Sequence, residues 1–241
     1  MNRRRFLFGA AALGAAGPVR PFMDGQTVII ARVEHVLTDL IAPSPAPLSG
    51  HAEPFADYAR VALEEAMLHG APLAPQSAKT DRWGRIAGPV RWRVGGGRET
   101  TLQEILLAEG AARVAPQSDE LQFIERCFAA ERAAREGGLG LWSSDAYRIR
   151  DAASPKNARG FQIYEGAIIS AADRNGRVFF NFGADFRSDF TATAAKGAFR
   201  RWKKKLDIAT LAGRRAEVRG HVDWINGPSI ELKHEMQMRV V

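Results

Sequence analysis

Residues 101–114 read TLQEILLAEGAARV, and the organisation of the first half of the chain follows outward from this stretch. We expect it to begin with a short helix, started by Thr100 or Thr101 and ended by Gly110, because hydroxyl side chains cap helix N-termini and glycine closes C-termini. A longer helix is expected over 118–138, with its first residue, a serine, as N-cap. Two helices of unequal length therefore close this half of the sequence.

The segments before that stretch predict strands and one more helix. Residues 27–30 are β-branched and apolar and predict a strand, and residues 33–37 predict a second. Residues 53–70 predict a helix, and residues 85–94, with the alternating VRWRV, predict a strand. The apolar face expected for the helix consists of Phe55, Tyr58, Val61, Leu63, Ala66 and Met67.

The second half of the chain is mostly β. Residues 146–160 are polar and without periodicity, which indicates a linker, and residues 161–241 form the expected second domain. Asn-Gly turns at 175–176 and 226–227 separate strands, and a helix at 196–206 follows the third strand. Five strands with a helix after the third, and a last short strand, predict a small Greek-key barrel of OB type.

Composition and charge limit the class of protein. The chain has 241 residues, 46% hydrophobic and 25% charged, which is typical of a globular protein. Residues 1–154 hold 18 Lys+Arg and 18 Asp+Glu, whereas residues 155–241 hold 16 and 9, so the net charge of +7 lies in the last third. This asymmetry predicts a partner such as nucleic acid or an acidic membrane surface, with solubility as the alternative. The lone cysteine, Cys127, is expected to be a buried structural thiol.

The first twenty residues predict export. Arg3 and Arg4, followed by Phe6 and Leu7, fit the twin-arginine pattern. The apolar run from 6 to 17 suits a signal peptide and is shorter than the roughly 20 residues of a membrane span. We therefore expect a signal peptide at 1–20 and a periplasmic or secreted protein. The alternative is an amphipathic or disordered N-terminus on a cytoplasmic protein.

Four landmarks occur in order along the first half: DGQT at 24–27, DRWGR at 81–85, LQEILLAEGAARV from 102, and GLGLWSSD from 138. As an ordered set they resemble the thermonuclease family, which is staphylococcal-nuclease-like, over residues 22–145. The resemblance implies a five-stranded OB barrel with three helices, and so a chain that is mainly β with helices (α+β). It also implies cleavage of DNA or RNA with calcium as cofactor.

The positions implied to be catalytic depart from the family pattern. Arg85 keeps one family arginine, but the other falls on Val36. The positions implied for calcium ligands and for the general base are Gln26, Ile41, Ala42 and Ser44. Losing one electrostatic group of this kind costs about 10²–10³ in rate. We therefore expect no metal site and negligible calcium-dependent cleavage.

Other polar residues offer no replacement site on sequence grounds. Arg85 is expected either to pin a turn with Asp81 or to contact a phosphate. The five histidines are scattered and without cysteine partners, so a zinc site is not expected. The nearby polar residues, expected to be solvated at the surface, are Glu34, His35, Asp39, Glu53 and Asp57.

The helix at 196–206, KGAFRRWKKKL, is the sharpest feature of the second half. Phe199, Trp202 and Leu206 fall on one helical face, so we expect them to pack on the barrel, although Trp202 exposed for base stacking is the alternative. The candidate nucleic-acid-binding residues are Arg82, Arg85, Arg200, Arg201, Lys203, Lys204 and Lys205.

Three functions remain open from the sequence. The leading hypothesis is an exported, catalytically degenerate thermonuclease-like protein that binds nucleic acid or another polyanion. The second is an active, divergent nuclease that hydrolyses phosphodiester bonds. The third is an envelope scaffold that binds other proteins. Enzymatic activity is therefore left open, with the missing acids arguing against it.

Overall fold

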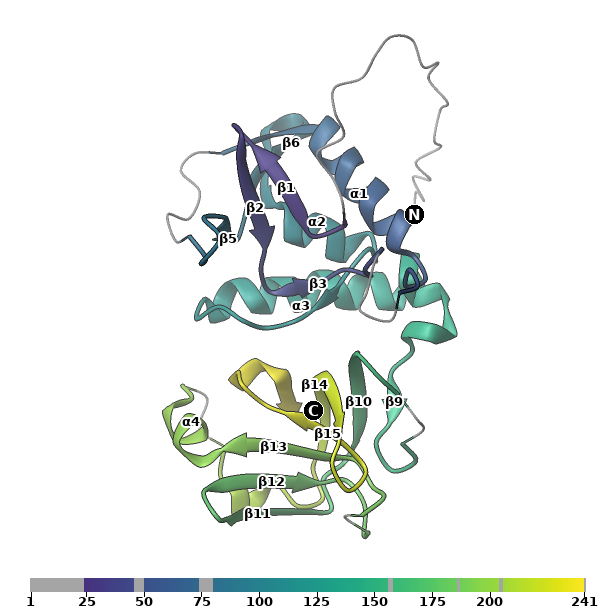
Figure 1. Cartoon of the computed structure of the whole chain (residues 1–241), viewed down its shortest axis with the longest axis vertical. Coiled ribbons are helices and arrows are strands. Elements are labelled where there is room, and N and C mark those ends of the chain that lie inside the picture. The colour runs from purple at the N-terminus through teal and green to yellow at the C-terminus, as the bar shows by residue number, and fades with distance from the viewer. Residues whose placement is uncertain are drawn as a thin grey trace.

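The computed structural model describes residues 24–45, 50–73, 80–155, 158–185, 187–203 and 206–240. It is a mixed α+β structure with many short strands and four α-helices in that described part. Figure 1 shows two regions, one built by the chain up to about residue 145 and one built by the later strands. The predicted signal peptide lies outside the described residues. No helix among the described residues is long and apolar enough to cross a membrane.

The first region consists of short strands around three helices. Its elements are β1 (Thr27–Ile30), β2 (Val33–Leu37), β3 (Leu40–Ile41), α1 (Ala56–Leu68), β4 (Gly70–Pro72), β5 (Ile86–Gly88), β6 (Arg91–Val94), η1 (Gly95–Gly97), β7 (Glu99–Thr101), α2 (Leu102–Ala108), β8 (Arg113–Val114), α3 (Leu121–Glu136) and η2 (Gly140–Ser143). The sheets are β1-β2-β5, β3-β8 and β4-β6-β7. No closed barrel is found among the described strands, so the five-stranded OB barrel expected from the family resemblance stays a prediction.

The strand predicted over 85–94 is two strands. β5 pairs in parallel with β2, whereas β6 pairs with β4 and β7 in a different sheet. Pro89 lies between them and has no backbone N–H to donate to a ladder. The proline therefore marks the point at which the chain changes sheets.

The three predicted helices of this region exist. The predicted start of the helix at 101 is confirmed, whereas the N-cap of the long helix and the buried face of the first helix were predicted wrongly. Thr101 is the N-cap of α2, since its side chain accepts a hydrogen bond from the backbone N–H of Glu104. The N-cap of α3 is Glu120 and not Ser118. The buried face of α1 also differs from the predicted one and uses smaller residues: Ala56, Ala59, Leu63 and Ala66 are buried, while Tyr58 and Val61 are exposed.

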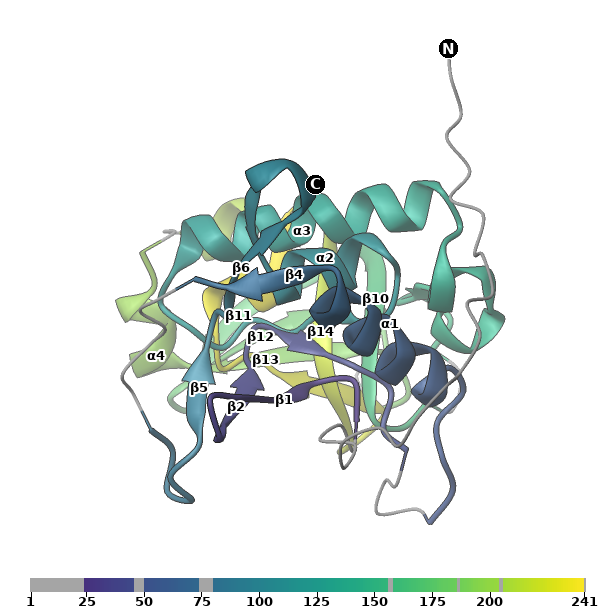
Figure 2. The same ribbon diagram turned by 90° about the horizontal axis from the view of Figure 1, so that it is seen from above.

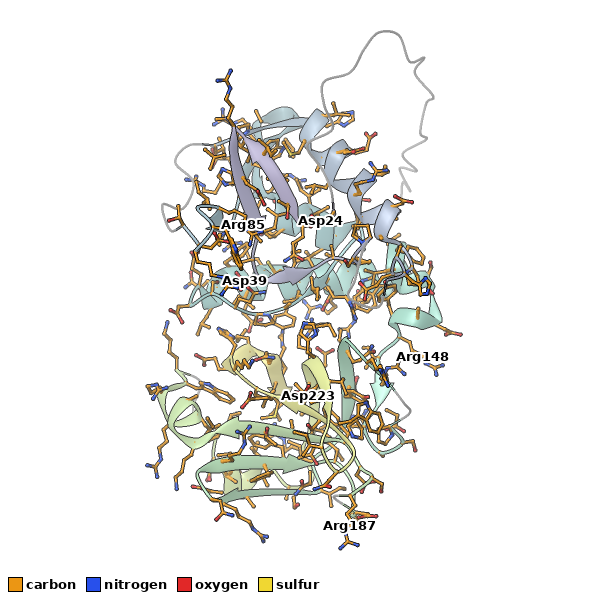
Figure 3. The ribbon with its side chains drawn as sticks, in the orientation of Figure 1. Asp24, Asp39, Arg85, Arg148, Arg187 and Asp223 are labelled. Carbon is orange, nitrogen blue, oxygen red and sulfur yellow. The ribbon has the colours of Figure 1, made fainter. Side chains whose placement is uncertain are left out.

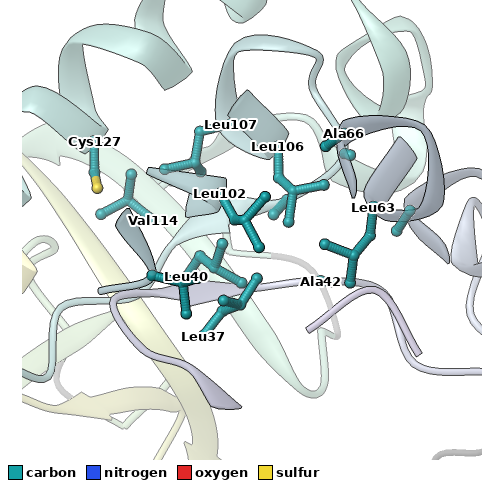
Figure 4. Close-up of a cluster of buried hydrophobic side chains, with 14 of the residues drawn as sticks. Leu37, Leu40, Ala42, Leu63, Ala66, Leu102, Leu106, Leu107, Val114 and Cys127 are labelled. Carbon is teal, nitrogen blue, oxygen red and sulfur yellow. The ribbon is translucent and has the colours of Figure 1, made fainter. Parts of the chain in front are cut away.

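The core of the first region lies between α1, α2, α3 and the short strands. Figure 4 shows leucines from α2 meeting Leu37 and Leu40 from β2 and β3. Cys127 belongs to this core and is fully buried, as predicted. Burial raises the pKa of its thiol, so the protonated, unreactive form is favoured.

The second region is one extended sheet with a short helix. Its elements are η3 (Asp145–Tyr147), β9 (Arg150–Asp151), β10 (Phe161–Ala167), β11 (Ser170–Arg174), β12 (Arg177–Asn181), β13 (Thr191–Ala195), α4 (Lys196–Arg201), η4 (Ile208–Thr210), β14 (Arg215–Trp224), β15 (Pro228–Glu231), η5 (Glu235–Gln237) and β16 (Met238–Val240). The strand order is β11-β12-β13-β15-β14-β10-β9, and β16 pairs with β14. Asn175 and Asn226 have positive φ, as the predicted Asn-Gly turns require.

The basic helix is shorter than the predicted 196–206. α4 ends at Arg201, and Trp202 already has an extended conformation. Trp202 is buried in the core of the second region, with Phe199 and Leu206 packed against that core, so the packing prediction is confirmed. Lys204 and Lys205 lie outside the described residues.

The predicted linker joins the two regions through defined contacts. Tyr147 is buried, and its hydroxyl donates to the carbonyl oxygen of Pro54 at 2.5 Å. β9 pairs in parallel with β10, and Ala152 is buried in the core of the second region. Residues near the linker therefore pack on both regions.

A buried ion pair holds the two regions together. Glu131 on α3 is 0% exposed and Arg219 on β14 is 1% exposed. Arg219 donates to both carboxylate oxygens of Glu131, at 3.1 and 2.9 Å, and also to Glu217. Glu217 in turn accepts from Arg135 of the first region at 2.7 Å. Figures 1 and 2 show α3 crossing the face of the first region that is turned toward β14.

The same junction fixes β8. The carboxylate of Glu131 accepts from the N–H of Val114 at 2.8 Å, while Arg219 donates to the carbonyl oxygen of Val114 at 2.9 Å. Arg113, also buried, donates to the carbonyl oxygen of Phe161 in β10 at 2.7 Å. Since β8 pairs with β3 at Ile41, these bonds hold β10 close to the family's metal-ligand position.

Candidate functional site

At the first position expected to bind calcium, Gln26 is fully engaged by backbone groups. Its amide nitrogen donates to the carbonyl oxygens of Leu37 and Leu40 at 3.1 and 3.2 Å. Its amide oxygen accepts from the N–H of Ala42 at 3.4 Å. The carboxamide therefore serves as a cross-link between β2 and β3, with its polar atoms turned to the chain's own backbone.

Asp24 is the nearest carboxylate in sequence, and it too is used locally. One oxygen accepts from the N–H groups of Gln26 and Thr27, at 2.9 and 2.7 Å, and the other accepts from the Thr27 hydroxyl at 3.3 Å. This is the usual arrangement of an Asp that fixes a turn. Figure 3 shows Asp24 near the start of β1, above the junction.

At the second metal position, Ile41 takes part in packing between the regions. It lies against a small buried cluster that contains Ala115 from the first region and Phe161 and Ile163 from β10. Ile41 is half-buried, so a carboxylate there would lose part of its hydration and lie against an aromatic ring, which is costly without a partner. The apolar residue at this position therefore suits the junction.

The residues present do not fit a calcium ion. Calcium takes six to eight oxygen ligands, mostly carboxylates and carbonyls. The positions in question offer the engaged amide of Gln26, the apolar Ile41 and Ala42, and Ser44, whose N–H donates to Glu53 at 2.7 Å. Within the described parts of the chain, no group of three or more His, Cys, Asp or Glu side chains is placed to hold a metal.

A pocket of about 580 Å³ lies over these positions, at the junction of the two regions. The first region contributes Asp24, Gln26, Glu53 and the segment 41–44, and the second contributes Arg159, Gly160, Phe161 and His221. Residues of the second region therefore form one wall of a pocket that contains the positions implied for the calcium ligands.

Arg85 is not among the residues that line this pocket, and its side chain is held in its own turn. Its Nε donates to Asp81 at 2.8 Å, and Glu34 lies 3.5 Å from its Nη1. Loss of hydration tends to raise the pKa of Asp81, but the hydrogen bonds and charge of Arg85 hold that pKa below its usual range. The prediction that Asp81 and Arg85 pin a turn is therefore confirmed.

Trp83 in the same turn is 64% exposed, and the guanidinium groups of two neighbouring arginines lie over its ring. The guanidinium of Arg82 lies 3.9 Å from the ring centroid and that of Arg85 lies 4.9 Å from it. An exposed aromatic flanked by cations can contact nucleic acid, because bases stack on aromatic rings and phosphates attract cations.

Two residues expected to be solvated are buried, which corrects the prediction. His35 is 3% exposed, and burial lowers its pKa, so the neutral imidazole is favoured. Asp39 is 0% exposed and accepts hydrogen bonds from the N–H groups of Gln117 and Ser118, both at 2.8 Å. Both residues therefore belong to the internal structure of the first region.

The remaining predicted binding residues lie on and after α4. Arg200 and Arg201 are exposed at its C-terminal end. Lys203 follows the helix, and its Nζ lies 3.4 Å from the carbonyl oxygen of Asp119 in the first region. In Figures 1 and 2, α4 and β5 lie on the same side of the molecule.

The sequence did not identify the junction residues, although one signal was available. Ile124, Cys127 and Phe128 form the buried face of α3, and Glu131 continues that face at helical spacing. A carboxylate on a buried helical face requires a partner, since an unpaired buried charge is costly. The partner, Arg219, lies 88 residues further along the chain, so sequence spacing gave no indication of it.

A family model described as Staphylococcal nuclease homologue matches residues 34–144. This region is staphylococcal-nuclease-like. The match includes the DRWGR turn, α2 and α3, and it confirms the resemblance over most of the predicted extent. The DGQT motif and the whole second region lie outside the matched residues. No curated protein matches the chain.

Proposed function

We propose that the chain is a catalytically degenerate nuclease homologue that binds nucleic acid or another polyanion without calcium-dependent cleavage. The observation that carries the proposal is the hydrogen bonding of Gln26. This side chain stands at a family metal position, but its amide is bonded to the backbone groups of Leu37, Leu40 and Ala42. Ile41 and Phe161 fill the second position. Retained affinity for nucleic acid is supported by the family match and by the Arg82–Trp83–Arg85 surface.

We further propose that both regions are OB-type folds. For the second region this is supported by the parallel pairing of β13 with β15, the position of α4 after β13, and the order of the strands. β11 is the first strand in this order and β10 is the last but one, yet only Ile168 and Ile169 separate them along the chain. The two ends of the sheet are therefore connected by two residues. An OB fold offers a β-face and loops on which oligonucleotides bind.

Export to the periplasm or outside the cell belongs to the same proposal. It is supported by the Arg3-Arg4-x-Phe6-Leu7 pattern and the apolar run that follows it. A fusion of residues 1–30 to a reporter that functions only after twin-arginine transport tests it. Transport that stops with Arg3→Lys plus Arg4→Lys supports export, and a reporter that stays cytoplasmic with the natural sequence contradicts it.

A divergent phosphodiesterase is the second candidate, and one observation favours it. Glu53 and His221 both line the junction pocket, and these residue types serve as general base and general acid. Their positions differ from the family's catalytic positions, so such an enzyme would use a different site.

One experiment separates the two. The mature protein is mixed with short labelled DNA and RNA, and binding and cleavage are followed together in calcium, magnesium or EDTA. The proposal expects binding that weakens strongly between about 50 and 200 mM salt, and intact substrate in every condition. Cleavage that is lost in Glu53→Gln, but kept in Glu64→Gln as a control on α1, would establish the second candidate.

A further inference from the structure

Trp224, at the end of β14, is a large aromatic side chain that is 48% exposed. Its indole N–H donates to the carbonyl oxygen of Ala158 at 3.0 Å, which holds the ring beside the segment that leads into β10. Tryptophan rings that have a bound N–H and an exposed face are suited to stacking, because little freedom is lost when a second ring packs on them.

Arginines lie close to this tryptophan, and hydrogen bonds of the Ala158–Gln162 segment link two of them to it. Arg159 follows Ala158, and its carbonyl oxygen accepts from the Gln162 side chain at 2.7 Å. The same Gln162 accepts from Nε of Arg150 at 2.7 Å. Arg148 and Arg150 together line a pocket of about 300 Å³ at β9. We name Arg148, Arg150, Arg159 and Trp224 the β9 surface.

The positive charge of this surface is not neutralised by ion pairs. Within the described residues, none of its three arginines has a carboxylate at ion-pairing distance, whereas Arg177 and Arg215 of the same region pair with Glu231 and Glu165. Acidic side chains lie close by: Asp151 lines the same pocket as Arg148 and Arg150, and Arg159 lines the junction pocket together with Asp24 and Glu53. Asp151 accepts from the N–H of Ala153 at 2.9 Å, and Asp223 precedes the tryptophan. What distinguishes this surface is that its three arginines make no ion pair within the described residues and that its indole ring is exposed.

We propose that the β9 surface binds single-stranded nucleic acid, with phosphates on the arginines and a base stacked on Trp224. The inference rests on the proposed function and names a place for it that differs from the α4 and Arg82–Arg85 groups. In Figure 3 Arg148 projects from the side of the molecule opposite α4. A single strand suits the surface better than a duplex, because its bases are free to stack on an exposed ring.

The test compares a single strand with a polyanion that has no bases. Binding of a fluorescent oligothymidylate of about 15 nucleotides and of fluorescent heparin is measured by anisotropy as a function of salt. Trp224→Ala is expected to weaken oligothymidylate binding about 10-fold and to leave heparin binding unchanged, because only the nucleic acid stacks. Trp224→Phe, which keeps a ring but loses the N–H, is expected to retain most of the affinity. Circular dichroism establishes that each variant is folded.

The arginines are tested with Arg148→Gln, Arg150→Gln and Arg159→Gln together. This variant is expected to weaken binding of both ligands and to reduce the salt slope for the oligonucleotide by about 2. Trp83→Ala is the comparison variant for Trp224→Ala: it removes an exposed tryptophan from the other candidate surface, and it weakens binding only if that surface also contacts the ligand.

The outcomes separate this inference from the proposed function. Wild-type protein that binds neither ligand contradicts both. Salt-dependent binding that Trp224→Ala leaves unchanged, or that only Trp83→Ala weakens, contradicts the β9 surface alone. Equal losses for oligothymidylate and heparin in a folded Trp224→Ala variant contradict the stacking role.

Discussion

Arg85 and Arg219 illustrate how differently the two regions use a buried or half-buried arginine. Arg85, retained from the family pattern, pairs with Asp81 four residues earlier and stabilises a turn. Arg219, from the region without a family match, pairs across the junction with Glu131 and bonds to β8. The first contact is local, whereas the second joins α3 to β14, the strand that pairs with β10. Residues of the region that matches the family are therefore bonded to, and packed against, residues outside it.

The same comparison explains the apolar metal position. Ile41 packs against Phe161, which the bond from Arg113 holds in place. The cluster around Phe161 needs an apolar residue at position 41, whereas a calcium site needs an oxygen ligand there. The two requirements exclude each other. The predictions below test how strongly the structure depends on the junction.

The largest effect is expected from Glu131→Ala. This change leaves Arg219 buried without its main partner and should lower the free energy of unfolding by about 3–5 kcal/mol. Urea denaturation measures it. The double variant Glu131→Met with Arg219→Met should recover much of the loss, since both charges are then absent. A loss below about 1 kcal/mol for Glu131→Ala would mean that the junction is weakly coupled.

Acid should weaken the junction next. Burial alone would raise the pKa of Glu217, but Arg219 and Arg135 lower it from 4.5 to about 2. A carboxylate with a lowered folded pKa stabilises the protein above pH 4.5, and this contribution is lost as pH falls from 4.5 to about 2. The loss is on the order of 3 kcal/mol. Urea denaturation at several pH values in that window should show a smaller pH dependence for Glu217→Gln than for wild type. Identical dependence would contradict the account.

A smaller effect is expected at Gln26. Gln26→Ala removes three hydrogen bonds to backbone groups and should cost about 1–3 kcal/mol. Gln26→Asp restores the family's residue type but cannot donate to the Leu37 and Leu40 carbonyl oxygens, so it should be destabilised as well. Thermal unfolding with and without calcium measures both. Stabilisation of Gln26→Asp by calcium would show that the remaining ligands are adequate after all.

The smallest effect is expected for Arg215→Ala, the matched control for the junction. Arg215 lies on β14 like Arg219, but its pair with Glu165 stays within the second region and is largely exposed. Exposed pairs contribute about 0–1 kcal/mol. A cost for Arg215→Ala as large as that for Glu131→Ala would remove the distinction between local and junction pairs.

The parts of the structure that were predictable are those set by neighbouring residues. Thr101 at the start of α2, the Asn-Gly turns and the burial of Trp202 depend on spacing of a few residues, and all were confirmed. Residues 85–94 form two strands, and Pro89 was a local signal for the break between them. The alternating pattern of VRWRV led instead to the prediction of a single strand.

The parts that could not be predicted depend on contacts between distant residues. The partners of Gln26 lie 11 to 16 residues away, and those of Arg219 lie in another region. The burial of Asp39 follows from its bonds to Gln117 and Ser118, 78 and 79 residues later. The landmark motifs located the family's site, but only the tertiary structure gave the uses of its residues.

The most direct test of the account is a calcium titration of the wild-type protein, followed by calorimetry and thermal unfolding. A site with a Kd of about 1 mM would add about 1.4 kcal/mol at about 10 mM calcium. The account predicts no saturable heat of binding and an unchanged Tm. The reason is that the Gln26 amide is hydrogen-bonded to backbone groups and Ile41 packs against Phe161. Stoichiometric binding with a raised Tm, abolished by Gln26→Ala but not by Trp83→Ala, would contradict it.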